Sequence, residues 1–166
     1  MKWFYLILCV STLEWCRAQV NSDFNNKLFA EVISFLEKEK KITADKLITL
    51  NIWSPTNKMS RDLNTEFEKT NSVYFKAKLK GGSKGVVSVI FCSDKDEVKT
   101  SIILNKDGIA ESIYLVKGGA NNVDLTNLLK NKPVGFNIVF DKDGNVIYEG
   151  LKPDAVFKSF NKLVTR

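Results

Sequence analysis

The stretch of sequence that decides the fold of this chain is Leu47-Ile48-Thr49-Leu50-Asn51-Ile52-Trp53-Ser54-Pro55-Thr56-Asn57-Lys58-Met59-Ser60-Arg61. The leucine and β-branched residues at its start predict a strand over 46–52. Ser54 and Pro55 are typical of a helix N-cap and first turn, so we expect a helix over about 55–70. The stretch thus predicts a buried strand that leads through Trp53 and a short turn into a helix.

Helix and strand patterns alternate along the rest of the chain. Apolar residues recur at helical spacing near both ends, and the turn Asp141-Lys142-Asp143-Gly144 between two apolar runs indicates a β-hairpin. We therefore expect helices at 23–40, 123–129 and 153–164, and a short helix that has its cap and first turn over 93–97 and ends near residue 105. Strands are expected at 86–91, 112–116, 135–140 and 145–149. This order predicts an α/β fold, with a central mixed β-sheet flanked by helices and an extra helix at the N-terminus.

Spacing within two of these helices indicates which side chains face the sheet. Met59, Leu63 and Phe67 are four residues apart, and side chains at that spacing lie on one helix face. Val98 and Ile102 have the same spacing in the next helix. We expect both sets to be buried.

The first 18 residues have the pattern of a secretory signal peptide. Lys2 precedes an apolar run over 3–10, and the predicted cleavage point follows Ala18. The apolar run is well short of the roughly 20 residues that span a bilayer. We therefore expect a secreted, extracellular protein with one domain over 19–166 and no stable membrane insertion after cleavage.

Cysteine and histidine usage excludes several kinds of chemistry. Cys9 and Cys16 lie in the predicted signal peptide, so the mature chain keeps only Cys92 and cannot form an intramolecular disulfide. The sequence has no histidine, which excludes Ser-His-Asp and Cys-His catalysis and ordinary histidine-ligated metal centres. We expect no metal and no cofactor.

The formal net charge is +6, but the lysines are scattered between acidic residues and do not form one long block. We interpret this charge as a contribution to solubility. The basic segment 76–84 contains two adjacent glycines and is predicted to be a solvated loop, with an anion site as a weaker alternative. Aromatic and basic residues are not interleaved as in single-strand binding surfaces, so no nucleic acid partner is expected.

Three segments of the chain resemble the thioredoxin-like superfamily, most closely its TlpA-like and nucleoredoxin-like branch. Residues 47–68 match the strand, tryptophan, turn and helix of that family, and residues 86–109 match its central strand and acidic helix start. Residues 131–144 are similar to its proline segment and Asp-Gly hairpin. The resemblance covers about 46–164 and implies a thioredoxin-like fold.

The resemblance also implies an active site, and this chain lacks its reactive atoms. The family's Cys-x-x-Cys pair falls on Asn57 and Ser60, close to Trp53. The family's proline, which is cis and lies beside the active-site helix, falls on Pro133. Dithiol exchange needs a nucleophilic thiolate and a second, resolving thiol. We therefore expect no catalytic residue, and we treat these four residues as vestigial active-site positions.

A protein of this kind would work by binding. The helix start between Trp53, Asn57 and Pro133 could form a polar notch for an extracellular protein or small ligand, but Asn57 and Ser60 are more readily interpreted as turn and helix-surface residues. One alternative is a single-cysteine peroxidase or reductase that uses Cys92 as a free thiol, and another is an extracellular small-ligand carrier. For Cys92 we favour a small hydrophobic role, because no histidine or cationic pocket is visible that would lower its pKa.

Overall fold

The computed structural model describes residues 22–39, 41, 44–94, 96–110, 112–116 and 123–165. The predicted signal peptide, its cleavage point and its two cysteines lie outside the described residues. Among the helices of the described residues, none combines the length and the apolar character needed to cross a membrane.

Five strands form one mixed sheet in the order β3-β2-β1-β4-β5. They are β1 (Leu47–Trp53), β2 (Val86–Cys92), β3 (Ile113–Val116), β4 (Asn137–Phe140) and β5 (Val146–Glu149). β1, β2 and β3 are parallel, whereas β4 and β5 run antiparallel to their neighbours. Every residue of β1 is buried, as expected for a central strand that is covered on both faces. The predicted hairpin is confirmed in β4 and β5.

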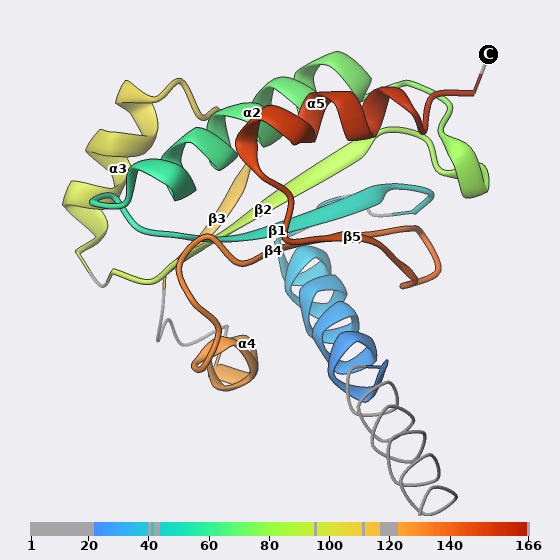
Figure 1. Ribbon diagram of the computed structural model, residues 1–166. Helices are drawn as coiled ribbons and strands as arrows, with labels where there is room; N and C mark the ends of the chain where they lie inside the picture. The colour runs from blue at the N-terminus through green and yellow to red at the C-terminus, as the bar shows by residue number, and fades with distance from the viewer. Residues whose placement is uncertain are drawn as a thin grey trace, which may run out of the picture.

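Helices cover both faces of this sheet (Figure 1). They are a helix over 22–38, α2 (Lys58–Tyr74), α3 (Glu97–Lys106), α4 (Val123–Leu129) and α5 (Pro153–Asn161). One face holds α2, α3 and α5, and Phe67 of α2 meets Phe160 of α5 with ring centroids 6.4 Å apart. The other face holds α4 and the helix over 22–38, whose Leu28, Val32 and Leu36 recur every four residues and are fully buried. The predicted α/β fold with an extra N-terminal helix is confirmed.

The N-terminal helix is held to the sheet by aromatic contacts. The ring of Phe29 lies 5.4 Å from that of Phe140 in β4. The ammonium group of Lys132 lies 4.3 Å from the ring centre of Phe24 and 4.6 Å from that of Phe136. A cation between two rings is attracted by both of them. These contacts attach the helix to the segment that enters β4.

Three details of α2 differ from the sequence prediction, the first being that the helix ends at Tyr74 and not near residue 70. The helix begins at Lys58 and is capped by Asn57, because Ser54 and Pro55 belong to the turn before it. Met59 is 50% exposed, since the first turn of α2 extends past the edge of the core.

α3 buries a different face from the predicted one. Val98 and Ile102 are 73% and 61% exposed, whereas Thr100 and Leu104 are buried. The hydroxyl of Thr100 lies 3.4 Å from the sulfur of Cys92, so a polar contact to the end of β2 orients this helix. The prediction from apolar spacing alone was therefore wrong for Val98 and Ile102.

Candidate functional site

The candidate site lies where β1 ends and α2 begins. Trp53, the last residue of β1, is fully buried in a cluster with Cys92 of β2 and Leu104 of α3. A short turn follows, in which the amide of Asn57 donates a hydrogen bond to the carbonyl of Ser54 at 3.1 Å. β1 is therefore followed by a short turn and the N-terminus of a helix, as the sequence predicts.

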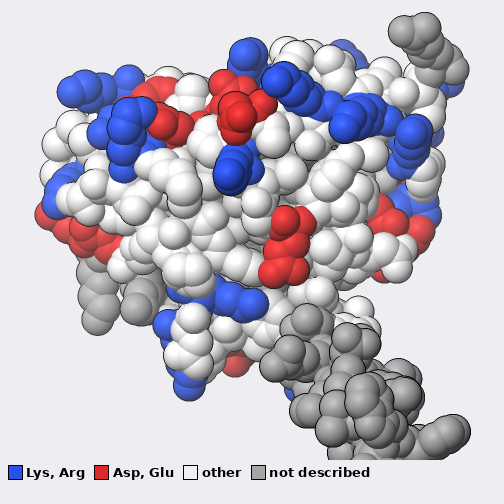
Figure 2. All heavy atoms as spheres, in the orientation of Figure 1, with Lys and Arg blue, Asp and Glu red and all other residues white. Residues whose placement is uncertain are grey.

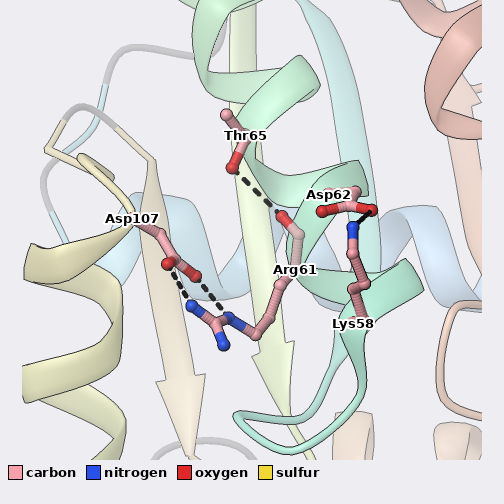
Figure 3. A pocket seen from close by; sticks show the side chains of 5 residues that line it. All are labelled: Lys58, Arg61, Asp62, Thr65 and Asp107. Carbon is pink, nitrogen blue, oxygen red and sulfur yellow. Dashed lines mark hydrogen bonds and ion pairs between the residues drawn. The ribbon is translucent and has the colours of Figure 1, made fainter.

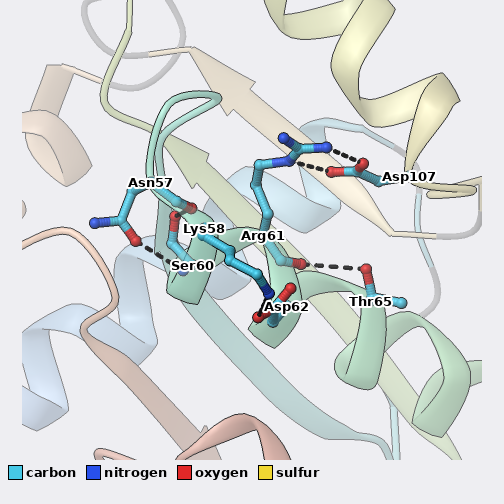
Figure 4. Close-up of polar contacts among 7 residues, drawn as sticks. All are labelled: Asn57, Lys58, Ser60, Arg61, Asp62, Thr65 and Asp107. Atoms are coloured by element: carbon cyan, nitrogen blue, oxygen red, sulfur yellow. Dashed lines mark hydrogen bonds and ion pairs between the residues drawn. The ribbon is translucent and has the colours of Figure 1, made fainter.

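Asn57 is the N-cap of α2. Its side-chain oxygen accepts a hydrogen bond from the amide of Ser60 at 2.9 Å (Figure 4). This amide belongs to the group of unpaired N–H donors at a helix start, which in a redox protein would stabilise a thiolate. Here the carboxamide oxygen of Asn57 accepts the hydrogen bond from that amide, so the donor has a structural role.

We expect Asn57→Ala to lower the free energy of unfolding by about 1 kcal/mol, because it removes the cap of α2. Urea unfolding followed by circular dichroism measures this loss. Asn57→Ser is the matched control, since its hydroxyl retains a capping oxygen and should restore most of the stability. Equal stability of the alanine and serine variants would contradict the capping role.

Ser60, at the second of the two motif positions, is fully buried. Its hydroxyl donates to the carbonyl of Asn57 at 3.0 Å and accepts from the amide of Ser54 at 3.2 Å. Both partners belong to the turn before α2. The hydroxyl therefore holds the turn against the helix and is not presented to a substrate.

A pair of buried amides lies behind Ser60. The side chain of Asn51, in the middle of β1, donates to the carbonyl of Ser60 at 3.3 Å and to the side-chain oxygen of Asn64 on α2. Both asparagines are 1% exposed. Their contact ties β1 to the first two turns of α2, and apolar periodicity does not reveal it.

The prediction of a cis Pro133 is wrong, because no described peptide bond is cis. Pro133 opens a β-turn in which the amide of Phe136 donates to the proline carbonyl at 3.0 Å. The chain reverses after the proline, at Gly135, whose φ is +90°. Pro133 is itself exposed and lies before the segment that pairs with β1.

Gly135 occupies the place beside α2 that the resemblance gave to Pro133. Its amide donates to the carbonyl of Ile52 at 2.7 Å, and a Cβ at this position would lie 2.5 Å from the terminal methyl of Met59. Only glycine fits both the positive φ and this close approach without a shift of the Met59 side chain. Counting back from the hairpin turn, and not from the proline, would have pointed to it.

A charged hollow lies along the exposed side of α2 (Figure 3). It has a volume of about 370 Å³ and is lined by Lys58, Arg61, Asp62, Thr65 and Asp107. Figure 3 shows Arg61 reaching across to Asp107 at the end of α3. The guanidinium Nε donates to the carboxylate at 2.7 Å, and Nη2 donates to its second oxygen.

This ion pair fixes the relative position of α2 and α3. The hydrogen bond to Asp107 raises the pKa of the Arg61 guanidinium, so the group stays charged. Lys58 and Asp62 form a second pair at 2.6 Å, one helical turn apart. The charges of the hollow are thus mostly neutralised within it, and it offers polar contacts but no nucleophile.

Glu68 is a further residue that the sequence did not single out. It is 8% exposed, and its carboxylate accepts hydrogen bonds from the amide of Ala110 at 2.8 Å and from the amide of Ser112 at 2.9 Å. The carboxylate thereby attaches the segment before β3 to α2. Its role is structural, and only the path of the chain brings these residues together.

Cys92, the possible free thiol, is fully buried at the end of β2. Burial raises the pKa of its thiol above the ordinary value, which lowers the thiolate fraction at neutral pH. Because the thiolate is the reactive form, this environment favours the small-hydrophobic interpretation over a peroxidatic one.

We expect native Cys92 to resist iodoacetamide at neutral pH for a time in which the urea-unfolded chain is fully labelled. The reaction requires opening of the structure and loss of a proton, and the raised pKa moves this proton loss to more alkaline pH. Mass spectrometry after timed quenching measures the labelled fraction. Equal labelling rates for the folded and unfolded chains would contradict the buried state.

Among the described residues, no group of three or more His, Cys, Asp or Glu side chains is placed to hold a metal ion. The prediction of no cofactor is not tested by this finding.

No family model matches the chain, and no curated protein matches its sequence. Its structure is similar to the thioredoxin domain of a thiol-disulfide oxidoreductase from Bacteroides vulgatus (TM-score 0.60, 14% identity, 74% of this chain and 82% of that one). It is also similar to a thiol:disulfide interchange protein from a Bacteroides species (0.57, 17%, 72% and 73%). A secreted disulfide oxidoreductase from Mycobacterium tuberculosis is a further match (0.53, 13%, 73% and 84%). These similarities show that the chain has a thioredoxin-like fold.

Proposed function

We propose that this chain is a secreted protein of thioredoxin-like fold that lacks dithiol exchange activity and acts by binding another protein. The observation that carries the proposal is the state of the two motif positions. Asn57 caps α2 through its side-chain oxygen, and the hydroxyl of Ser60 is buried against the turn. Both groups have structural partners, and neither is a thiol.

Thiol-disulfide exchange begins with attack of a thiolate on a disulfide sulfur and ends when a second thiol releases the mixed disulfide. A carboxamide has no comparable nucleophilicity, and a serine without a neighbouring base is unreactive at neutral pH. The remaining thiol of the described chain, Cys92, is buried. No route to the exchange reaction is left at this site.

The rim of the site has the character of a protein-binding surface. Met59 is 50% exposed and packs against Gly135, which leaves an accessible apolar group above the entry to β4. The side chain of Lys58 next to it is 87% exposed. An apolar centre with charged groups around it is a common arrangement at protein interfaces.

The charged hollow supports a second candidate function, the carriage of a small polar ligand. Its volume of about 370 Å³ lies at the lower end of the range for small-molecule sites. A thermal-shift screen distinguishes this function, because a ligand that binds the native state raises the melting temperature. Most of the hollow's charges are paired with one another, so protein binding is the function we favour.

The proposal is tested on protein purified from the medium of cells that express the full chain. We expect the recovered chain to begin after Ala18, as its N-terminal sequence would show. In an insulin assay with dithiothreitol, the protein should not accelerate disulfide reduction beyond the reagent alone. Acceleration that is lost in Cys92→Ser would overturn the proposal in favour of single-cysteine catalysis.

Binding is tested by capture of proteins from extracellular fluid. Met59→Lys places a charge at the apolar centre of this surface and should abolish capture of any specific partner. Val98→Lys is the matched control, because Val98 is also exposed but lies on α3. A partner that is lost equally in both variants would not be using this site.

A further inference from the structure

Two stretches of the sequence that lie far apart contain lysines and no aspartate or glutamate. The first runs over 69–93 and holds five lysines. The second runs over 155–166 and holds two lysines and Arg166. Because the two stretches are far apart in the sequence, the sequence alone does not show that they are adjacent in space.

The tertiary structure places these two stretches side by side. Leu79 and Val164 form an antiparallel bridge, and the amide of Lys80 donates to the carbonyl of Leu163 at 2.7 Å. The amide of Thr165 donates to a carbonyl of the first stretch at 3.0 Å. The loop after α2 and the end of α5 therefore share one surface.

Six exposed lysines make up what we call the lysine surface: Lys76, Lys78, Lys80, Lys84, Lys158 and Lys162. Within the described part of the chain, none of them has a carboxylate oxygen within 4.0 Å of its ammonium nitrogen. Figure 2 shows basic side chains in a row over α5 and toward the C-terminus. The surface is bordered by Lys142, which is paired with Asp143 at 2.7 Å.

The arrangement of these lysines is unfavourable for the isolated protein. Lys78 and Lys84 are bridge partners on neighbouring extended segments, and like charges directly opposite each other are destabilising. Leu79 lies between Lys78 and Lys80 in the sequence, points inward and is 2% exposed, so the side chains of both lysines point outward. A bound anion would attract these lysines and offset their mutual repulsion.

We propose that the lysine surface binds a linear sulfated polysaccharide. The choice among polyanions rests on the proposed secretion of the chain. Anionic lipids are concentrated in the cytoplasmic leaflet of membranes, which a secreted protein does not meet. Single-stranded nucleic acids need a series of stacking aromatic rings, whereas the stretch 73–85 exposes one large ring, that of Phe75.

The geometry of the surface fits an extended chain of anions. The loop lysines lie on two paired segments, and Lys158 and Lys162 are one turn apart at the end of α5, which adjoins them. Contacts of this kind release counterions from a polyanion, so affinity should fall steeply with salt concentration.

The test compares two triple variants with the same net charge. Lys78→Gln/Lys80→Gln/Lys84→Gln removes half of the lysine surface. The matched control, Lys38→Gln/Lys106→Gln/Lys130→Gln, removes three exposed lysines from other elements. Binding of a fluorescent heparin oligosaccharide is measured by anisotropy over a range of salt concentrations, and urea unfolding verifies that both variants are folded.

We expect the surface variant to lose at least about tenfold in affinity, and the plot of log affinity against log salt to become shallower, its slope less negative by about two. The control should remain close to wild type. Equal losses in both variants would overturn the proposal, because binding would then depend on total charge alone. Tighter binding of a single-stranded DNA of equal charge would overturn the choice of a polysaccharide. Both outcomes are independent of the insulin assay, which tests the other proposal.

Discussion

A variant that carries both Asn57→Cys and Ser60→Cys is expected to reduce insulin disulfides at least about tenfold faster than the wild-type chain, with dithiothreitol as the electron source. The thiol introduced by Asn57→Cys would stand at the N-cap of α2, where free amides and the helix dipole stabilise a thiolate. Position 60 is fully buried, so the second thiol would be protected and placed to resolve the mixed disulfide. Turbidity of precipitating insulin measures the rate.

Two control measures separate this gain from general thiol reactivity. Asn57→Cys alone supplies a nucleophile without a resolving thiol, so it should accumulate mixed disulfides and turn over slowly. All variants carry Cys92→Ser, which removes the buried thiol from consideration. Activity of the variant with Asn57→Cys alone equal to that of the double variant would contradict a paired mechanism at these positions.

The largest loss of stability is expected for Gly85→Ala, at the entrance to β2. Gly85 has a φ of +85°, and a Cβ added there would lie 2.1 Å from the carbonyl oxygen of Phe75. Two hydrogen bonds hold the backbone in place. The amide of Gly85 donates to the carbonyl of Ala77, and the carbonyl of Gly85 accepts from the amide of Leu47. We expect the free energy of unfolding to fall by more than about 3 kcal/mol, as measured by urea unfolding.

Gly150→Ala is the matched control for this substitution. Gly150 also has a positive φ, +69°, but no atom lies within 4 Å of its added Cβ. It therefore reports backbone strain alone, which costs about 1–2 kcal/mol. If both variants lose the same amount of stability, steric overlap at Gly85 has no role.

The elements that repeat a local pattern were predictable. The two central parallel strands, the Asp-Gly hairpin and the amphipathic helices at 22–38 and α5 each leave a periodic or turn signal in the sequence. The placement of Asn57 and Ser60 at the start of α2 was also predictable, because both follow the strand at a short and fixed distance. These features depend on residues that are close in sequence.

Two of the incorrect predictions show how contacts decide what apolar spacing and capping preference leave open. Val98 and Ile102 have apolar spacing, but the burial of Thr100 and Leu104 decides which face of α3 meets the sheet. Ser54 is a good capping residue, but the turn extends to Asn57 because Ser60 hydrogen-bonds to it. At α3 a contact to the sheet overrides the local apolar spacing. At α2 the Asn57–Ser60 contact, which is itself local, places the cap three residues after Ser54.

The sequence by itself determined the order of helices and strands, and it determined that no thiol pair stands at the start of α2. These properties are encoded in residue types and short spacings. The tertiary structure alone decided that Arg61 pairs with Asp107 and that the carboxylate of Glu68 meets the segment before β3. It also decided that residues 69–93 and 155–166, two stretches without aspartate or glutamate, share one surface. Such contacts join residues that are distant in sequence, and they depend on the path of the whole chain around the sheet.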